Sequence, residues 1–356
     1  MIVKSATKDY EVHIEDSLDF IKALAGVENA FYVVDAKVWS LYAPQMSALS
    51  ADRVFKLNAT EENKVIDTAL AICEAMVGMD AKRNAHLISF GGGITQDVTG
   101  FAANVLYRGV KWTYVPTTLL AACDSCIGGK TSLNYKSYKN LLGTFFPPDD
   151  IYICPEFFKT LSKPDLESGL GEVVKFNVMS GSDAVADLEQ SIDSLLELEP
   201  AVVNRFVEKS LGFKKGIIEE DEFDLGRRVL LNFAHTFGHA FEVSSSYVIP
   251  HGTAVALGMV AANSASCERG MLDGDIAERV EALVAHIMPE IDPGLIDFEK
   301  VMPAIRKDKK QVGSNLTAVL LDSDYILHVV HDMAEEEIRK ACAYVQAFLE
   351  KCNRSL

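Results

Sequence analysis

The sequence is poor in several features that mark whole classes of protein. No run of about eighteen apolar residues occurs among the 356 positions, so we expect no membrane-spanning helix. The N-terminal stretch, MIVKSATKDYEVHIEDSLDF, lacks the apolar segment that a secretory signal carries. Positive charge is also scarce, since 34 Lys and Arg stand against 51 Asp and Glu. The net charge of −17 argues against nucleic acid or an acidic membrane surface as a partner.

Cysteine is sparse and its pattern is irregular. Seven cysteines, an odd number scattered along the chain, do not make a disulfide framework, so we expect a cytoplasmic protein in a reducing compartment. Cys123 and Cys126 form CDSC, which has the spacing of a redox motif or of half a zinc site. Because no second pair lies nearby, we interpret them as small buried thiols beside a loop.

The first half of the chain alternates strand and helix patterns. Runs rich in β-branched and aromatic residues predict strands, and helical patterns lie between them, which favours a mostly parallel sheet with helices on both faces. From about residue 165 the patterns are helical. The sequence therefore predicts a Rossmann-like α/β domain over residues 1–160 and an all-helical domain over 161–356. The predicted strands are the run ending in Asp35 within AFYVVDAKVW (30–39), and DRVFKLN (52–58), HLISF (86–90) and KWTYV (111–115).

A glycine triplet at 91–93 follows the strand predicted at 86–90 and precedes a helical pattern. Turns of this kind bring the amides of a helix N-terminus close to a phosphate. Because GGGITQD is not the GxGxxG dinucleotide fingerprint, a plain tight turn stays an alternative. Asp35, Thr117 and Thr118 end two other predicted strands. Polar groups at strand ends meet in the ligand crevice of open α/β sheets, which favours a nucleotide site.

Polar residues interrupt the apolar stretch LNFAHTFGHAFE at 231–242. On one continuous helix, six polar residues at spacings of 4, 4, 3, 4 and 3 would fall within an arc of about 80°. Surface helices have a wide polar face, whereas this one would carry a narrow polar stripe. We therefore expect the stripe to be enclosed and to line a polar cavity. Its members are Asp224, Arg228, Asn232, His235, His239 and Glu242.

The stripe contains candidate metal ligands. His235 and His239 have a spacing that can bind zinc, but Thr236 stands where the HExxH protease motif requires glutamate. His251 and Glu172 are further candidates, at the start of one helical pattern and within another. A glutamate with two or three histidines in a helical domain predicts a catalytic zinc with open coordination positions.

Lysines cluster beside glycine turns and near the stripe. In an acidic protein each could simply be a solubilising surface residue, but their placement predicts a pocket for a phosphate and a carboxylate. The residues concerned are Asp124, Lys130, Lys139, Asn140, Lys214, Lys309 and Lys310, with Lys175 one turn after Glu172.

Taken together, these segments resemble the 3-dehydroquinate synthase family of sugar-phosphate cyclases. The resemblance rests on GGGITQDVTGF, YRGVKWTYVPTTLLAACDSCIGGKTSLN, KNLLGTFFPP, GLGEVVKF, RRVLLNFAHTFGHAFE and PHGTAVALGM. It implies an NAD-dependent enzyme with one divalent metal, zinc or cobalt. Its substrate would be 3-deoxy-D-arabino-heptulosonate 7-phosphate, which is oxidised, loses phosphate, is reduced again and closes to a carbocycle.

The resemblance also implies roles for individual residues. It makes Glu172, His235 and His251 the metal ligands and places His239 in the substrate pocket. It makes Arg108 a ligand to the phosphate in a neighbouring subunit, which implies a homodimer. The implied substrate contacts are Asp124, Lys130, Lys139, Asn140, Lys175, Lys214, Arg228, Asn232 and one of Lys309 and Lys310. The implied NAD contacts are Asp35, Glu61, Lys64, Gly92, Gly93, Ile94, Asp97, Thr117, Thr118 and Thr160.

The chain departs from the family pattern at a few positions. Ala234 replaces the usual glycine of GHT, Thr253 replaces the glutamate of HGE, and Asp224 stands where a longer glutamate is common. Sister cyclases differ mainly at substrate-binding positions, so another sugar phosphate stays an alternative. A metal-dependent polyol dehydrogenase and a non-catalytic NAD sensor are the other two readings of the same motifs.

Overall fold

The computed structural model describes residues 1–136, 138–307 and 316–354. The chain divides into two compact units. The first comprises Met1–Leu161 and Ile218–Phe223, and the second comprises Ser162–Ile217 and Asp224–Leu356. The first is an α/β unit and the second is mainly helical, which confirms the predicted fold class.

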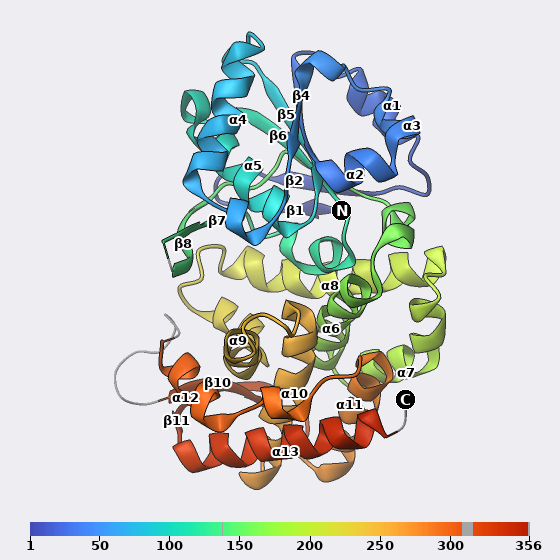
Figure 1. The fold of residues 1–356 in the computed structure, drawn as a ribbon. Helices are drawn as coiled ribbons and strands as arrows, with labels where there is room; N and C mark the ends of the chain where they lie inside the picture. Colours follow the sequence, from blue (N-terminus) through green and yellow to red (C-terminus); the bar gives the residue numbers. More distant parts are fainter. Residues whose placement is uncertain (137, 308–315, 355–356) are drawn as a thin grey trace. The chain divides into compact units, whose positions relative to one another are not determined.

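A seven-stranded sheet forms the centre of the first unit (Figure 1). Its order is β1-β2-β9-β6-β5-β3-β4, and every neighbouring pair is parallel except the antiparallel β1 and β2. The parallel pairing agrees with the strand and helix alternation in the sequence. The strands are β1 (Ile2–Val3), β2 (Tyr10–Ile14), β3 (Ala30–Asp35), β4 (Val54–Leu57), β5 (His86–Gly91), β6 (Lys111–Pro116) and β9 (Asp150–Ile153).

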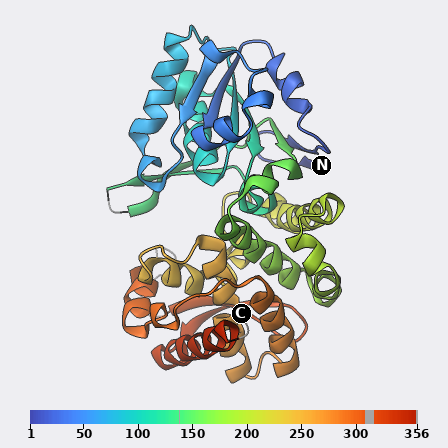
Figure 2. The same cartoon turned by 45° about the vertical axis from the view of Figure 1, so that its right-hand side comes forward.

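Helices cover both faces of this sheet, with α4 and α5 on one side and α1, α2 and α3 on the other (Figures 1 and 2). Double coverage explains why β3 reads as an almost continuous apolar run, since a strand buried on both faces needs apolar side chains at every position. The helices are α1 (Phe20–Ala25), α2 (Ala36–Leu41), α3 (Ala43–Met46), α4 (Ile66–Gly78) and α5 (Gly93–Val105).

A separate two-stranded antiparallel sheet, β7 (Lys130–Tyr135) and β8 (Tyr138–Phe145), extends from the first unit. A single parallel bridge between Val65 and Asn134 ties it to the segment that leads into α4. Neither strand was predicted from the sequence. They carry several of the lysines and asparagines that were singled out from the motifs.

The second unit packs its helices around α10, which is buried along most of its length. Such a helix needs apolar or small residues all round, and HGTAVALGMVAANSASCE supplies them. An antiparallel pair, β10 and β11, is the departure from the expected all-helical composition. The elements are α6 (Lys163–Ser180), α7 (Ser182–Leu196), α8 (Pro200–Glu220), α9 (His235–Ser244), α10 (His251–Glu268), α11 (Gly274–Ile287), α12 (Phe298–Lys307), β10 (Leu316–Leu321), β11 (Leu327–Met333) and α13 (Glu335–Asn353).

Within the described part of the chain, no helix combines the length and the apolar character that a membrane crossing requires.

Candidate active site

In the second unit, three helices approach one another closely enough to bring a carboxylate and several imidazole side chains together. A Cβ atom on Gly171 would lie 2.0 Å from the carbonyl oxygen of Gly252, and one on Gly258 would lie 2.1 Å from that of Ala234. Only glycine permits such contacts between backbones. These contacts set α6 beside α10 and α10 beside the start of α9, where Glu172, His251 and His235 are carried.

The carboxylate of Glu172 is the centre of this group. It is fully buried, and neither of its oxygens accepts a well-aligned hydrogen bond from a described residue. Instead, Oε2 lies 2.5 Å from Nζ of Lys175, while Oε1 lies 3.5 Å from Nε2 of His235 and 3.4 Å from Nε2 of His251. A buried carboxylate that lacks aligned hydrogen bonds and lies beside two imidazoles fits the role of a metal ligand.

The spacing of these atoms fits a metal ion. Bonds of about 2.0–2.1 Å to tetrahedral zinc place neighbouring ligand atoms about 3.3 Å apart. The contacts of Oε1 of Glu172 with the two Nε2 atoms, at 3.4 and 3.5 Å, are close to this value. The ring nitrogens of His235, His239 and His251 also lie within 4.8 Å of one another. His239 therefore stands beside the predicted ligands, and both ligand sets that the sequence suggested are assembled in one place.

The second ring nitrogen of each predicted histidine ligand has its own partner. Nδ1 of His235 lies 3.0 Å from the carbonyl oxygen of Phe233, so it is the nitrogen that carries the proton and donates. Nδ1 of His251 lies 3.2 Å from Oε2 of Glu242. Both contacts use Nδ1 and turn Nε2 toward Oε1 of Glu172, which is the arrangement that oriented metal ligands show.

Electrostatics at this group favour a cation. Burial opposes ionisation of Glu172, but the nearby Lys175 and His251 outweigh it and lower its pKa to about 2. Burial likewise opposes protonation of His251, yet the carboxylates of Glu172 and Glu242 raise its pKa to about 9. The two carboxylates that raise the pKa of His251 would equally attract a divalent cation. A divalent ion would take the place of that proton.

The stripe predicted from residue 224 to 242 is not one continuous helix. Arg227–Asn232 form a 3-10 helix, and Ala234 adopts the left-handed conformation with φ of 68° before α9 begins at His235. The predicted 80° arc therefore holds only for the three members on α9. Arg228 is nevertheless buried, as is Lys214 on α8. Their burial fits an enclosed cationic group better than a role as surface solubilisers.

In the first unit, several predicted NAD-binding residues follow adjacent parallel strands. Asp35 ends β3, residues 92–94 follow β5, and Thr117 follows β6. The amide of Thr117 donates to the carbonyl oxygen of Gly91 over 3.0 Å, which fixes two of these strand ends side by side. Strand order β3-β5-β6 places all three at the same edge of the sheet. Open α/β sheets bind their ligands at this end of the strands.

Packing explains two of the three glycines in this turn but not the third. A Cβ on Gly91 would lie 2.2 Å from Oγ1 of Thr95, and one on Gly92 would lie 3.1 Å from Cγ2 of Thr118, so packing accounts for both. A Cβ on Gly93 would approach only Oγ of Ser125, at 3.8 Å. Packing does not require glycine there, which leaves space beside the N-terminus of α5. Ile94 continues the first turn of the same helix.

Two of the predicted NAD contacts also have local structural roles. A side-chain oxygen of Asp35 accepts from the amide of Lys37 over 2.8 Å and caps α2, and burial raises the pKa of this carboxyl. Thr160 shares a 2.9 Å hydrogen bond with the hydroxyl of Tyr42 and donates to the carbonyl oxygen of Phe157.

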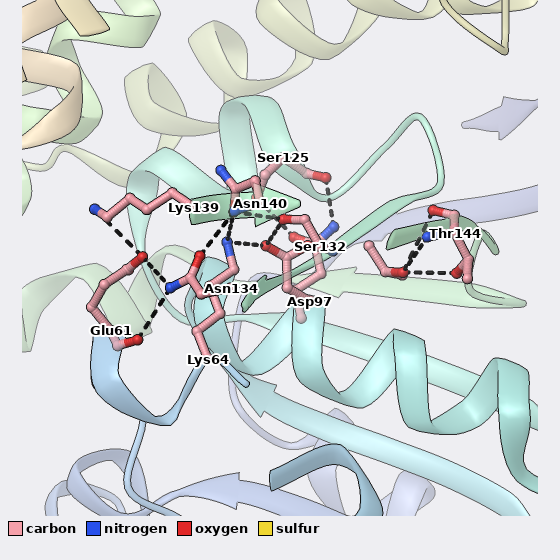
Figure 3. Close-up of polar contacts among 11 residues, drawn as sticks. Glu61, Lys64, Asp97, Ser125, Ser132, Asn134, Lys139, Asn140 and Thr144 are labelled. Carbon is pink, nitrogen blue, oxygen red and sulfur yellow. Dashed lines mark hydrogen bonds and ion pairs between the residues drawn. The ribbon is translucent and has the colours of Figure 1, made fainter. Parts of the chain in front are cut away.

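A polar network joins five predicted residues of the first unit, namely Glu61, Lys64, Asp97, Lys139 and Asn140 (Figure 3). Nζ of Lys64 lies 2.6 Å from Oδ2 of Asp97 and donates to Oδ1 of Asn140 over 2.7 Å. Nζ of Lys139 lies 3.4 Å from Oε1 of Glu61. The sequence assigned these residues partly to NAD and partly to substrate, and the structure places them in one connected group.

Ser132 and Asn134 complete the network, and the sequence analysis missed both. The backbone amide of Ser132 donates to Asp97, and its hydroxyl lies within hydrogen-bond distance of both Asp97 and Asn140. Asn134 contacts Glu61 and the amide of Asn140 (Figure 3). A signal was present, because both alternate with Lys130 in KTSLNY and so share one face of β7. Reading that run as a strand would have pointed to them.

The remaining predicted residues lie at separate places. Asp124 sits in the π-helical turn Ala121–Ser125, beside the free cysteines Cys123 and Cys126, which are buried as expected. Lys130 is exposed at the start of β7, and Arg108 is exposed in the turn after α5. Asn232 ends the 3-10 helix that carries Arg228. Lys309 and Lys310 lie outside the described residues.

A second group of possible metal ligands, Glu11, His13 and Asp150, lies on β2 and β9. Nε2 of His13 is 3.1 Å from Oδ1 of Asp150, but both carboxylates are well exposed to solvent. Exposed ion pairs of this kind are common. Unlike the group around Glu172, this group contains no buried carboxylate.

Comparisons with known proteins agree on one family. The family model described as 3-dehydroquinate synthase N-terminal matches residues 54–168, and the one described as 3-dehydroquinate synthase C-terminal matches 169–311. The chain is 36% identical over 341 residues to the 3-dehydroquinate synthase of Clostridium tetani, covering 93% of this chain and 91% of that protein.

Solved structures of related cyclases have the same fold. The 2-epi-5-epi-valiolone synthase of Streptomyces hygroscopicus, with NAD+ and Zn2+ bound, matches with a TM-score of 0.84 and 26% identity over 97% of this chain and 99% of that one. A 2-deoxy-scyllo-inosose synthase complexed with carbaglucose-6-phosphate, NAD+ and Co2+ matches with a TM-score of 0.80 and 20% identity, over 96% and 98%. Since both halves of the family model and a full-length relative align with it, this chain belongs to the 3-dehydroquinate synthase family.

Proposed function

We propose that the protein converts 3-deoxy-D-arabino-heptulosonate 7-phosphate into 3-dehydroquinate and phosphate, as a lyase that uses catalytic NAD and one divalent metal. Membership of the family supports the reaction. The observation that carries it is the buried Glu172 carboxylate with the Nε2 atoms of His235 and His251 at metal-ligand spacing. When bound, a divalent metal supplies Lewis acidity at a substrate hydroxyl, and NAD supplies a reversible hydride acceptor.

Residues of the second unit would hold the metal and one end of the substrate. Glu172, His235 and His251 form the proposed ligand set, and Lys175 neutralises the oxygen of Glu172 that faces away from the histidines. The buried cations Lys214 and Arg228 suit the substrate carboxylate, because charge-assisted hydrogen bonds are strongest away from water. We assign His239, beside the ligands, to proton transfer with the substrate.

Residues of the first unit would bind NAD and further polar groups of the substrate. The strand ends at Asp35, Thr117 and Gly92–Ile94 suit the dinucleotide, as does the network around Glu61, Lys64 and Asp97. Lys139 and Asn140 stand in the same network and would reach the substrate. Asp124 and Lys130 are further proposed substrate contacts, and Thr118 and Thr160 are further proposed NAD contacts.

One assay tests the function. Purified protein is incubated with the heptulosonate phosphate, NAD and zinc, and both phosphate and the absorbance of NADH are followed. We expect phosphate release without net NADH, loss of turnover with a chelator, and recovery with zinc or cobalt. A polyol dehydrogenase would accumulate NADH, and a non-catalytic sensor would produce neither signal. Full turnover by metal-stripped protein would contradict the metal assignment.

The similarity to 2-epi-5-epi-valiolone synthase favours a second candidate, another sugar-phosphate cyclase. The two candidate functions can be told apart by whether the enzyme requires a carboxylate on its substrate. If Arg228 and Lys214 bind that carboxylate, a sugar phosphate of equal length without it should be a poor substrate. Preference for the sugar phosphate that lacks the carboxylate would favour the second candidate.

We also propose that the enzyme is a cytoplasmic homodimer. All seven cysteines are free, as expected in a reducing compartment. The exposed Arg108 suits the phosphate of a neighbouring active site, as the family resemblance implies.

A further inference from the structure

Asn134 occupies a central position in the polar network of the first unit (Figure 3). It lies near the end of β7 and is 9% exposed. Its side chain connects two segments that are far apart in the sequence, the 3-10 helix at Glu61 and the strand β8 at Asn140. Its backbone amide also donates to the carbonyl oxygen of Lys64 over 2.7 Å.

Each polar atom of the Asn134 side chain has its own hydrogen-bond partners. Nδ2 donates to Oε1 of Glu61 over 2.8 Å and to its carbonyl oxygen over 3.3 Å, while Oδ1 accepts from the amide of Asn140 over 2.9 Å. A carboxylate needs a donor and an amide N–H needs an acceptor, so these partners allow only one orientation of the amide group. No other uncharged side chain of this length offers a donor and an acceptor in that geometry.

The contact with Asn140 stabilises an unusual backbone. Asn140 has φ of 51°, in the left-handed region that few residues other than glycine and asparagine adopt. Its side-chain oxygen accepts from Lys64 and Ser132, and its amide is held by Asn134. This conformation also determines where the neighbouring Lys139 projects, 3.4 Å from the same Glu61 oxygen that Asn134 contacts.

We propose that Asn134 is a positioning residue that fixes the Glu61 carboxylate on the cofactor side and the Lys139–Asn140 backbone on the substrate side. The inference rests on the proposed function, which assigns Glu61 to NAD and Lys139 and Asn140 to substrate. It adds a residue to which nothing else assigns a role. It predicts that one side chain affects cofactor affinity and substrate affinity through two separable hydrogen bonds.

Two substitutions separate those bonds. Asn134→Ala removes both, so NAD affinity should fall and the KM for the sugar phosphate should rise, each by about tenfold, as expected for losing a hydrogen bond to a charged or strained group. Asn134→Asp keeps an acceptor for the Asn140 amide but sets a second carboxylate against Glu61. It should weaken NAD binding at least as much as the alanine variant does, while KM for substrate stays near the wild-type value.

Asn63→Ala is the matched control. Asn63 belongs to the same 3-10 helix as Glu61. Nδ2 of its side chain donates to the carbonyl oxygen of Asn58 and to Oγ1 of Thr60. Its loss loosens the turn without touching Glu61 or Asn140 directly. We expect NAD affinity and KM close to wild type.

The experiment measures NAD dissociation constants by calorimetry, steady-state KM for the heptulosonate phosphate, and thermal unfolding of each variant. The alanine and aspartate pattern described above supports the inference. Unchanged NAD affinity in the near-isosteric aspartate variant overturns it, even if the alanine variant is unstable. Equal losses in the Asn63 control also overturn it, since they indicate general loosening. Wild-type protein that neither binds NAD nor turns over would instead refute the proposed function.

Discussion

At the scale of single residues, the orientation of two imidazole rings does most to define the proposed metal site. Nδ1 of His235 is held by a backbone carbonyl oxygen, and Nδ1 of His251 by the carboxylate of Glu242. A carboxylate behind a histidine ligand fixes its tautomer and raises its basicity. Glu242 would therefore support a metal at the proposed site without binding it. The sequence marked Glu242 as part of the stripe but could not show which partner it serves.

Glu242→Gln should weaken zinc binding by about 10- to 100-fold, the usual effect of losing such a partner. The amide keeps the size of the side chain but loses the charge that favours Nε2 as the metal-binding nitrogen. Competition with a chromogenic chelator measures the affinity directly. Glu189→Gln, which removes the partner of Arg279 elsewhere in the same unit, is the control and should leave zinc affinity unchanged. Equal affinities in both variants would contradict the role of Glu242.

Two adjacent arginines allow a second test at this scale. Arg228 is buried, whereas Arg227 is exposed. If Arg228 binds the substrate carboxylate, Arg228→Ala should lower kcat/KM by at least about tenfold, because a charge-assisted hydrogen bond contributes about 1.5–3 kcal/mol. Arg227→Ala should behave like wild type in the same steady-state assay. Circular dichroism checks that both fold, and normal kinetics in a folded Arg228 variant would remove it from the site.

At the scale of elements, the sequence predicted β3, β4, β5 and β6 of the seven-stranded sheet but not β1, β2 or β9, and it predicted the polar stripe poorly. Strand and helix periodicity is local, so β3, β5 and β6 and the polar residues at their ends were readable. The stripe assumed one helix, and the left-handed Ala234 interrupts it. The bond between Asn134 and Glu61 joins positions 73 residues apart, which no local pattern reveals.

Ala234 stands where the family usually has glycine, and its backbone gives the reason for that preference. A left-handed residue with a Cβ is strained by about 1–2 kcal/mol, a cost that glycine avoids. Loss of the buried methyl group and the greater freedom of unfolded glycine act in the opposite direction. Substitution of Ala234 alone would mix these effects, so a reference position is needed.

Ala240 provides that reference, because it is as buried as Ala234, at 2% exposure, but lies inside α9. We expect Ala240→Gly to destabilise the protein more than Ala234→Gly does, by about 1–2 kcal/mol in free energy of unfolding. Denaturant titration of the two variants and the wild type measures this difference. Equal destabilisation by both substitutions would show that Ala234 carries no backbone strain.

At the scale of the whole molecule, the proposed NAD-binding residues lie in the first unit and the proposed metal ligands in the second. Arg108 belongs to neither cluster. It lies in a turn where Tyr107, Arg108 and Gly109 have φ of 53°, 66° and 112°, and the hydroxyl of Tyr107 donates to the carbonyl oxygen of Ala81 over 3.0 Å. Such a strained turn, anchored at one residue, holds Arg108 exposed. This exposure suits a residue that acts on a neighbouring subunit.

Mixed dimers test whether Arg108 acts on the partner. Arg108→Ala and His251→Ala should each be nearly inactive alone. In a hybrid of the two, one site would combine intact metal ligands from the first subunit with intact Arg108 from the second. Half of randomly assembled dimers are hybrids with one working site of two, so differently tagged subunits made together should recover about a quarter of wild-type activity. If Arg108 served its own subunit, each site would lack either Arg108 or His251, and no activity would return.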